Sequence, residues 1–275
     1  MAIKIALAGN PNCGKTTMFN ALTGANQYVG NWPGVTVEKK EGKCKENKDV
    51  IVTDLPGIYS LSPYTLEEVV SRDYLLKEKP EAIINLVDAT NIERNLYLTT
   101  QLLELGIPVV VALNMADLLE KNKISIDTKA LEKELGCKVV KTSALKGTGI
   151  HEVVKEAVTA AKKESIVSGK IKFSKDTEAA VSEMEEQLPS SVLKEQKRRY
   201  AIKLLERDAK VLEQLKLTAS VQNQVEKIAA KLEEKLEFIR RYMPSIETFS
   251  MYGAVCSLMN KSDADMEGPK ELGVN

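Results

Sequence analysis

Near its amino terminus the chain carries the octapeptide Gly-Asn-Pro-Asn-Cys-Gly-Lys-Thr, residues 9–16, directly after an apolar run at residues 3–8. The octapeptide matches the pattern G-x-x-x-x-G-K-[ST] at every fixed position. In such a loop, backbone N–H groups curl around a polyphosphate, Lys15 neutralises the outer oxygens, and the Thr16 hydroxyl can hold magnesium. A buried strand before the loop and a helix at residues 15–22 after it would bring the positive end of a helix dipole to the anion. We expect the phosphate site to comprise Gly9, Asn10, Pro11, Asn12, Cys13, Gly14, Lys15, Thr16 and Thr17.

Short apolar runs and amphipathic stretches alternate up to about residue 163, which is typical of strands and crossover helices in a mostly parallel sheet. Strands are expected at residues 3–8, 36–44, 50–54, 82–87, 109–114 and 139–142. Helices are expected at residues 15–22, 66–76, 96–105, 128–135 and 150–163. The pattern predicts an α/β fold, a doubly wound sheet of the P-loop class that binds ligands at the carboxyl ends of its strands. The alternative to the phosphate loop is an ordinary Gly/Asn/Pro turn between a strand and a helix.

The second half of the chain has a different pattern, and 275 residues are enough for two modest domains. A segment at residues 164–170 has the composition of a linker, and beyond Ser174 the strand signals disappear. Apolar residues then recur at helical spacing, for example Val181, Met184 and Leu188. We predict a nucleotide-binding domain at residues 1–164, a small all-helical domain at residues 165–260 and a polar tail at residues 261–275.

The charge balance and the apolar runs exclude several classes of partner. Lysine plus arginine and aspartate plus glutamate both total 39, so no net charge recruits nucleic acid or an acidic membrane surface. No stretch approaches the roughly 18 consecutive apolar residues of a membrane helix, and the first residues do not resemble a signal peptide. We therefore expect a cytoplasmic chain with no membrane span and no nucleic-acid partner.

Four cysteines are scattered along the chain without a C-x-x-C pair: Cys13, Cys44, Cys137 and Cys256. Only one histidine, His151, accompanies them, and we assign it no role. A zinc or iron–sulfur site is therefore not expected, and free thiols are the simplest account. Cys13 lies inside the phosphate loop, where it is either a redox-sensitive thiol of lowered pKa or a small spacer.

A second motif, Asp-Leu-Pro-Gly, closes the expected strand at residues 50–54. Asp54 can bind magnesium through water, and Gly57 can turn its N–H toward a terminal phosphate. Taken alone, this tetrapeptide could equally be a simple turn. Its place in register with the phosphate loop favours the nucleotide role.

Two further motifs follow at strand ends and point to the base. A carboxylate such as Asp117 can accept hydrogen bonds from N1–H and the exocyclic amine of guanine, a pattern that adenine does not offer. The segment at residues 143–145 can provide a backbone N–H to the guanine carbonyl. The candidate base-binding residues are Asn114, Met115, Asp117, Ser143, Ala144 and Leu145. The four motifs, in this order and each at a strand end, resemble those of the translation-factor-related GTPases.

The segment Tyr-Val-Gly-Asn-Trp-Pro-Gly-Val-Thr-Val-Glu at residues 28–38 holds the only tryptophan and lies where GTPases keep the loop that senses the terminal phosphate. Together with four further segments it resembles the cytosolic amino-terminal part of the ferrous iron transport protein B family, FeoB. The further segments are residues 54–62, 72–74, 87–90 and 93–98. The resemblance is continuous over residues 3–163 and extends more loosely to residues 199–206, in the helical domain that this family uses to slow GDP release.

The resemblance implies specific roles for residues near the phosphates. Thr36 would join the magnesium ion only when the terminal phosphate is present. Asn12 would coordinate potassium, helped by main-chain carbonyls near Gly30 and Trp32, and the ion would stabilise developing negative charge. The alternative for Asn12 is a plain turn residue. We therefore expect Asn12, Thr36 and Gly57 to serve catalysis, Thr16, Thr36 and Asp54 to serve magnesium, and Asn12, Gly30 and Trp32 to serve potassium.

Two positions depart from the generic GTPase pattern. Ile58 stands where Ras-like proteins carry the glutamine that positions the attacking water, so we expect slow intrinsic hydrolysis. Met115 replaces the usual lysine of the guanine motif. It keeps a flexible apolar stem along the base and loses the charge, which is compatible with moderate affinity and fast exchange.

The leading hypothesis is a regulatory GTPase that uses GTP or GDP, magnesium and potassium, with GTP ordering the loops around Thr36 and Gly57. The resemblance implies a membrane permease for ferrous iron as partner, small regulatory Feo proteins as further partners, and a location at the inner face of the cell membrane. The first alternative is an RNA- or ribosome-associated GTPase, against which the balanced charge argues. A nucleotide-binding scaffold without turnover is the second alternative, because of Ile58.

Overall fold

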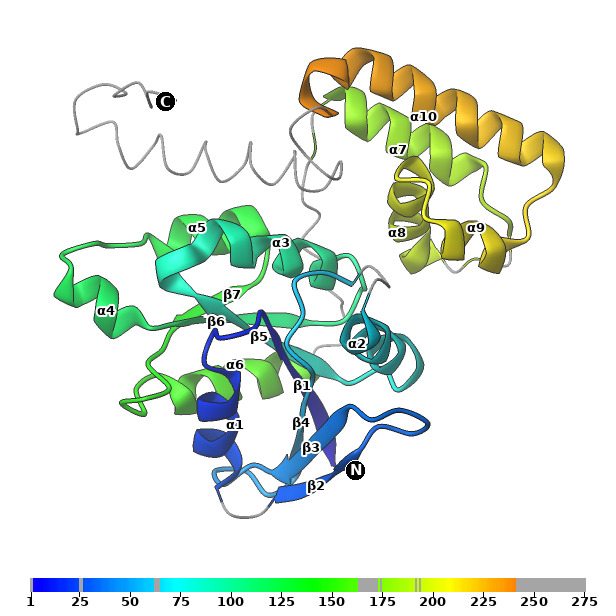
Figure 1. Ribbon diagram of the computed structural model, residues 1–275. Helices are drawn as coiled ribbons and strands as arrows, with labels where there is room; N and C mark the ends of the chain where they lie inside the picture. Colours follow the sequence, from blue (N-terminus) through cyan, green and yellow to red (C-terminus); the bar gives the residue numbers. More distant parts are fainter. Residues whose placement is uncertain are drawn as a thin grey trace.

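The computed structural model describes residues 2–24, 27–61, 65–162, 173, 175–190, 192 and 194–240. Its centre is a sheet of seven strands in the order β2-β3-β4-β1-β5-β6-β7 (Figure 1). The strands are β1 (Ile3–Gly9), β2 (Gln27–Asn31), β3 (Glu38–Lys43), β4 (Val50–Asp54), β5 (Ala82–Asp88), β6 (Val109–Asn114) and β7 (Lys138–Lys141). The pairs β2–β3 and β3–β4 are antiparallel and the remaining pairs are parallel. This arrangement confirms the predicted doubly wound, mostly parallel α/β sheet.

The central strands are mostly apolar because both of their faces are covered. Along β1, Ile5 and Leu7 face one buried cluster, whereas Ala6 and Ala8 face the other. This is the alternation that a strand imposes on successive side chains. The edge hairpin of β2 and β3 is mostly polar, and most of its residues are exposed or half-buried.

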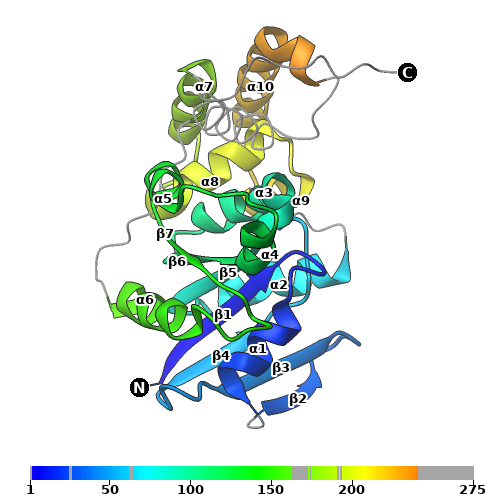
Figure 2. The same ribbon diagram turned by 90° about the vertical axis from the view of Figure 1, so that its left-hand side faces the viewer.

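Helices cover both faces of the sheet. One face is covered by α1 and α6, and the other by the helices between β4 and β7 (Figures 1 and 2). The bounds are α1 (Lys15–Thr23), α2 (Leu66–Lys77), η1 (Ala89–Asn91), α3 (Ile92–Leu103), α4 (Ala116–Lys121), α5 (Thr128–Leu135) and α6 (Ile150–Lys162). Capping chemistry sets some of these limits: Thr65 and Glu68 form a reciprocal capping box at the start of α2, and Gly136 ends α5 in the left-handed conformation.

The second half of the described chain is helical, as predicted. It consists of α7 (Lys175–Glu186), α8 (Lys194–Leu205), α9 (Ala209–Leu215) and α10 (Ala219–Arg240). The predicted apolar stripe of Val181, Met184 and Leu188 is buried, and Val225 of α10 is buried in the same cluster. These stripes are therefore core positions.

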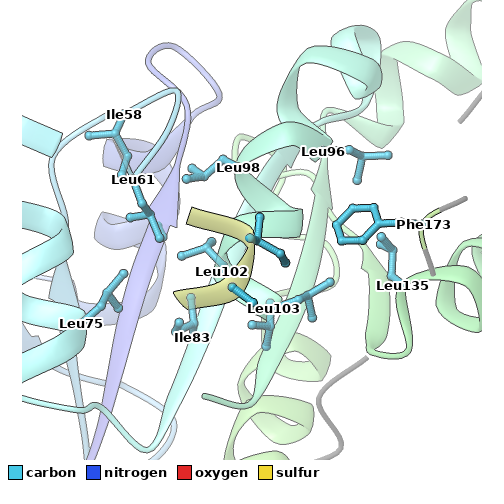
Figure 3. Packing of buried hydrophobic residues seen from close by; sticks show 14 of the residues in the cluster. Ile58, Leu61, Leu75, Ile83, Leu96, Leu98, Leu102, Leu103, Leu135 and Phe173 are labelled. Carbon is cyan, nitrogen blue, oxygen red and sulfur yellow. The ribbon is translucent and has the colours of Figure 1, made fainter. Parts of the chain in front are cut away.

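The helices α7–α10 lie on the side of the sheet that α2 and α3 cover (Figure 2). Phe173 belongs to the same buried cluster as Leu96 and Leu135 (Figure 3). Two ion pairs cross the same boundary: Arg198 to Glu104 at 3.4 Å, and Arg72 of α2 to Asp208 at 3.9 Å. Apolar packing and charge pairs thus join the two parts.

Several limits differ from the predicted ones. The strand β2 was not expected, and β3 begins only at Glu38, because the pairing of β2 with β3 forms a hairpin out of the predicted sensor loop. The helix α3 begins at Ile92, before the predicted start at residue 96, and the short α4 was missed. The predicted linker from residue 164 to 170, the tail at residues 261–275 and Cys256 lie outside the described residues.

Within the ranges that the structure describes, no helix has both the length and the apolar character that crossing a bilayer requires.

Candidate nucleotide-binding site

The phosphate loop lies at the carboxyl end of β1 and leads into α1. Its backbone takes unusual conformations, with φ of 65° at Asn12 and 92° at Gly14. A Cβ atom at Gly14 would stand 2.6 Å from Nδ2 of Asn114, so only glycine fits there. Asn12, Thr16 and Thr17 are exposed, so a ligand can reach them.

The turn after β4 packs directly against this loop. A Cβ atom at Gly57 would lie 3.2 Å from Nζ of Lys15 and 3.2 Å from Cα of Pro11. The backbone N–H of Ile58 donates to the carbonyl of Gly9 at 3.3 Å. The structure therefore brings Gly57 to the lysine of the phosphate loop, as the order of the motifs predicts.

Asp54 lies at the end of β4, and its side-chain oxygen Oδ1 is buried without a hydrogen-bond partner. Burial raises the pKa of this carboxyl to about 6, although the nearby Lys15 acts in the opposite direction. An unpaired carboxylate oxygen beside a phosphate loop fits a divalent cation, because magnesium prefers hard oxygen ligands. The residues present are therefore compatible with magnesium at Asp54 and at the hydroxyl of Thr16.

Asn114 connects the phosphate loop to the base-binding segments. Its Nδ2 donates to the carbonyl of Cys13 at 2.9 Å. Its Oδ1 accepts from the backbone N–H of Ala144 at 2.9 Å and from the hydroxyl of Thr142 at 3.4 Å. One buried side chain thus holds together loops that follow three different strands.

Asp117 of α4 faces the loop after β7. A hydrogen bond from Ser143 and a contact with Lys146, whose Nζ lies 3.4 Å away, lower the pKa of its carboxyl. The carboxylate is therefore ionised and can accept hydrogen bonds. Met115 caps the start of this helix in the left-handed conformation, and Leu145, in the loop after β7, is 85% exposed.

The predicted sensor loop packs against α2 and not against the phosphate loop. Trp32 is buried against Tyr74 of α2, with ring centroids 5.2 Å apart and ring planes at 71°. Its backbone N–H donates to the carbonyl of Val37, which closes a turn on which Thr36 is exposed. Gly30 pairs with Lys39 inside the β2–β3 hairpin. In the part of the chain described, no hydrogen bond or ring contact joins Gly30, Trp32 or Thr36 to residues 9–17.

Cys13 is buried, and burial raises the pKa of its thiol to about 11. A thiol of raised pKa is not the reactive thiolate that one reading of the sequence suggested, so Cys13 is a small spacer in the loop. Among the described residues, no group of three or more His, Cys, Asp or Glu side chains is arranged to hold a metal ion. His151 is exposed at the start of α6 and contacts Glu46 at 2.6 Å.

The contact between Arg94 and Tyr59, beside the phosphate loop, was not predicted from the sequence. The guanidinium carbon of Arg94 lies 4.1 Å from the ring centroid of Tyr59, in the turn after Gly57. Asn10 donates through Nδ2 to the carbonyl of Arg94 at 3.4 Å. The only signal in the sequence was the family-like segment at residues 93–98, which contains Arg94 but does not reveal its partners.

Comparison with known proteins agrees with this geometry. A family model described as ferrous iron transport protein B matches residues 3–157, which is more than half of the chain. A model of the FeoB cytosolic helical domain matches residues 173–260. The chain belongs to the FeoB family. The resemblance noted in the sequence is therefore confirmed.

Curated FeoB proteins are similar over part of their length. The Fe(2+) transporter FeoB of Salmonella typhimurium is 53% identical over 161 residues, which are 57% of this chain and 21% of the relative. The Fe(2+) transporter FeoB of Escherichia coli K12 is 44% identical over 211 residues, which are 75% of this chain and 27% of the relative. The chain thus spans only 21% to 27% of the length of these FeoB relatives.

Solved FeoB structures match nearly the whole chain. A point mutant of S. thermophilus NFeoB bound to mGDP has a TM-score of 0.84 at 47% identity, covering 94% of this chain and 99% of that one. S. thermophilus NFeoB bound to GDP.AlF4- and K+ has a TM-score of 0.82 at 46% identity with the same coverage. These matches confirm the predicted P-loop GTPase fold followed by a helical domain, and they support the predicted GTPase activity.

Proposed function

We propose that this chain binds GTP and GDP and hydrolyses GTP slowly, as the nucleotide switch of a ferrous iron permease. The observation that carries the proposal is the bridge made by Asn114 between Cys13 of the phosphate loop and Ala144 of the loop beside Asp117. This bridge brings a phosphate-binding segment and a carboxylate suited to guanine into one site. Bound nucleotide analogues in similar FeoB structures support the same assignment.

The phosphates would lie along residues 9–17, with Lys15 as the fixed positive charge. Magnesium would be held by the Thr16 hydroxyl, by Asp54 through water, and by Thr36 in the GTP state. When bound, this ion neutralises charge on the phosphate oxygens. The unpartnered Oδ1 of Asp54 supports this role, because a nearby cation would remove the cost of burying it.

Guanine would be read by Asp117, whose lowered pKa keeps it an acceptor for N1–H and the exocyclic amine. Backbone groups of Ser143, Ala144 and Leu145 would meet the guanine carbonyl. Met115 would lie along the base, in place of the lysine used by other GTPases. An adenine base offers the opposite hydrogen-bond pattern, so the site selects GTP over ATP.

Potassium would sit beside the phosphates on Asn12, with carbonyls near Gly30 and Trp32 completing the site. Asn12 is exposed, so an ion can reach it. The similar NFeoB structure bound to GDP.AlF4- and K+ supports a monovalent ion in this family. The ion would stabilise charge that develops during hydrolysis. Because Ile58 is buried and apolar, no side chain at that position can orient water, which makes slow intrinsic hydrolysis the expected result.

Switching would consist of moving Thr36 from its exposed position to the magnesium ion when GTP binds. Gly57 would turn its N–H to the terminal phosphate in the same step. This turn precedes α2 in the chain, so its rearrangement would shift α2. Because Arg72 of α2 pairs with Asp208, that shift would be transmitted to the helices α7–α10. We propose domain limits of 1–164 and 165–260, with residues 261–275 as a tail.

The partner would be a membrane permease for ferrous iron, in the same protein or complex, with small Feo proteins as further regulators. The names of the curated relatives support this, and the matched parts are only 21% and 27% of the length of those relatives. The chain would then work in the cytoplasm at the inner face of the membrane. An RNA-associated GTPase is not favoured, because lysine and arginine do not exceed aspartate and glutamate.

Competition binding tests the proposed nucleotide specificity. Labelled GDP should be displaced by unlabelled GTP and should stay bound in excess ATP. The Lys15→Ala variant should lose most of its affinity for GDP. Displacement by ATP as effective as that by GTP would contradict the assignment of Asp117. For the transport role, cells whose complete reading frame carries Lys15→Ala should take up less ferrous iron than wild-type cells at the same protein level.

A further inference from the structure

Arg94 of α3 contacts both walls of the phosphate site. Its guanidinium lies over the ring of Tyr59, 4.1 Å from the centroid, and its carbonyl accepts a hydrogen bond from Asn10 at 3.4 Å. Asn10 belongs to the phosphate loop, and Tyr59 belongs to the turn that carries Gly57. Arg94 therefore links the two segments between which a terminal phosphate would lie.

The turn has further anchors on each side of Tyr59, among them a hydrogen bond from the Ser60 hydroxyl to Oε1 of Glu68 at 3.2 Å. The N–H of Ile58 donates to the carbonyl of Gly9 at 3.3 Å. The N–H of Leu61 donates to Oε1 of Gln101 on α3 at 2.6 Å. Ile58 and Leu61 also belong to the buried cluster that contains Leu98 of α3 (Figure 3). Tyr59 lies between these anchors and is 39% exposed, and the guanidinium of Arg94 stacks on its ring.

The backbone of Arg94 is well placed to act as a support. The neighbouring Asn95 is buried, accepts a hydrogen bond from the N–H of Asp88 at 3.2 Å, and donates to the carbonyl of Asn91 at 2.9 Å. These bonds tie the first turn of α3 to the end of β5. Because this turn of α3 is fixed, the guanidinium of Arg94 starts from a fixed backbone. Its attraction to the face of the tyrosine ring therefore restrains the ring.

We propose that Arg94 is a positioning residue for GTP hydrolysis, acting through Tyr59 on the backbone of Gly57. The proposal rests on the GTPase function proposed above. Because Ile58 offers no group to orient water, the main chain of this turn has to do so, and its position then limits the rate. Within the described chain the contacts of Arg94 are with Tyr59 and Asn10 and not with Lys15 or Asp117, so its loss should leave nucleotide affinity unchanged.

Four single variants and one double variant test this by steady-state GTP hydrolysis with magnesium and potassium. Arg94→Gln should lower kcat by about threefold to fivefold, the loss expected for an exposed cation–π contact, without changing KM or GDP affinity. Tyr59→Leu should lower kcat to the same extent. Arg94→Lys and Tyr59→Phe should each recover at least half of the wild-type rate, because a cation and a ring remain. The double variant Arg94→Gln with Tyr59→Leu should be no slower than either single variant.

Lys155→Gln is the matched control, because it removes one exposed positive charge from α6 and should keep the wild-type kcat. If Arg94→Gln lowers kcat while Tyr59→Leu does not, Arg94 touches the phosphates directly and the proposed route through Tyr59 is wrong. Unchanged kcat in both variants would also overturn the proposal. A wild-type rate no higher than that of Lys15→Ala would instead refute the GTPase function itself, with GDP binding showing that the protein is folded.

Discussion

The side-chain amide of Asn114 donates a hydrogen bond to the main-chain carbonyl of Cys13 over 2.9 Å, from the end of β6 to the phosphate loop. The side-chain oxygen of Asn114, Oδ1, accepts a hydrogen bond from the backbone N–H of Ala144. Asn114→Ala should therefore lower the free energy of unfolding by about 2 kcal/mol, because buried partners are left unpaired. GDP affinity should fall as well, since the two halves of the site lose their common anchor.

Urea unfolding and binding of labelled GDP measure both effects. The exposed Asn122 at the end of α4 provides the control: Asn122→Ala should stay within about 0.5 kcal/mol of wild type and bind GDP normally. Equal behaviour of the two variants would show that Asn114 does not organise the site.

Asp54 should make the stability of the nucleotide-free protein depend on pH. Burial raises the pKa of its carboxyl from 3.8 to about 6 in the folded state. Between these values the unfolded chain binds fewer protons than the folded one, so this contribution to stability falls as pH rises from about 4 to about 6. Asp54→Asn should therefore be more stabilising at pH 7.5 than at pH 5, by about 1 kcal/mol.

Chemical unfolding at the two pH values, with Asp49→Asn as an exposed control, measures the difference. Magnesium adds a second readout. Magnesium with GDP should stabilise wild type more than GDP alone, and this increment should be lost in Asp54→Asn. An increment that survives the substitution would place the cation elsewhere.

Asp117→Asn should lower GDP affinity by at least about a hundredfold, because a site built to accept hydrogen bonds from the base is left with a donor facing a donor. Xanthosine diphosphate carries a carbonyl where guanine has its amine, so its affinity should rise in the same variant. Glu120→Gln removes an exposed carboxylate from the same helix and should change neither affinity. A parallel loss of both nucleotides in Asp117→Asn would indicate collapse of the site rather than base recognition.

Trp32 should report the nucleotide state by fluorescence, because it is the only tryptophan in the chain. In this structure it packs on Tyr74 with its Nε1 buried and unpartnered. Bringing Thr36 to magnesium should pull the neighbouring Trp32 away from α2 and shift its emission to longer wavelength. The shift should occur with a GTP analogue and not with GDP. Thr36→Ala should abolish it, and an unchanged spectrum in the wild-type protein would mean that this loop does not move.

The sequence predicted elements with strong local signals. The helix Thr128–Leu135 was predicted with its observed limits, and in the structure Asp127 caps its first turn and Gly136 ends it. The phosphate loop, Asp54, Asn114 and Asp117 were likewise found at strand ends. Local patterns were sufficient in these cases because each motif has its own spacing and its own neighbouring strand.

Features that depend on distant partners were not predictable in this way. The strand β2 has Tyr28 and Val29 exposed, and it exists because it pairs with β3. The contact of Arg94 with Tyr59 joins two segments that are far apart in the sequence. The raised pKa of Cys13 follows from burial, which the loop sequence does not reveal.

Phosphate release from GTP, measured with magnesium in potassium and in sodium at equal ionic strength, tests the central claim most directly. We predict slow release from GTP and not from ATP, a several-fold higher rate in potassium, and loss of that difference in Asn12→Ala with GDP affinity retained. Equal rates in the two salts would remove the potassium site. Release no faster than that of Lys15→Ala would contradict the assignment of this chain as a GTP-hydrolysing switch.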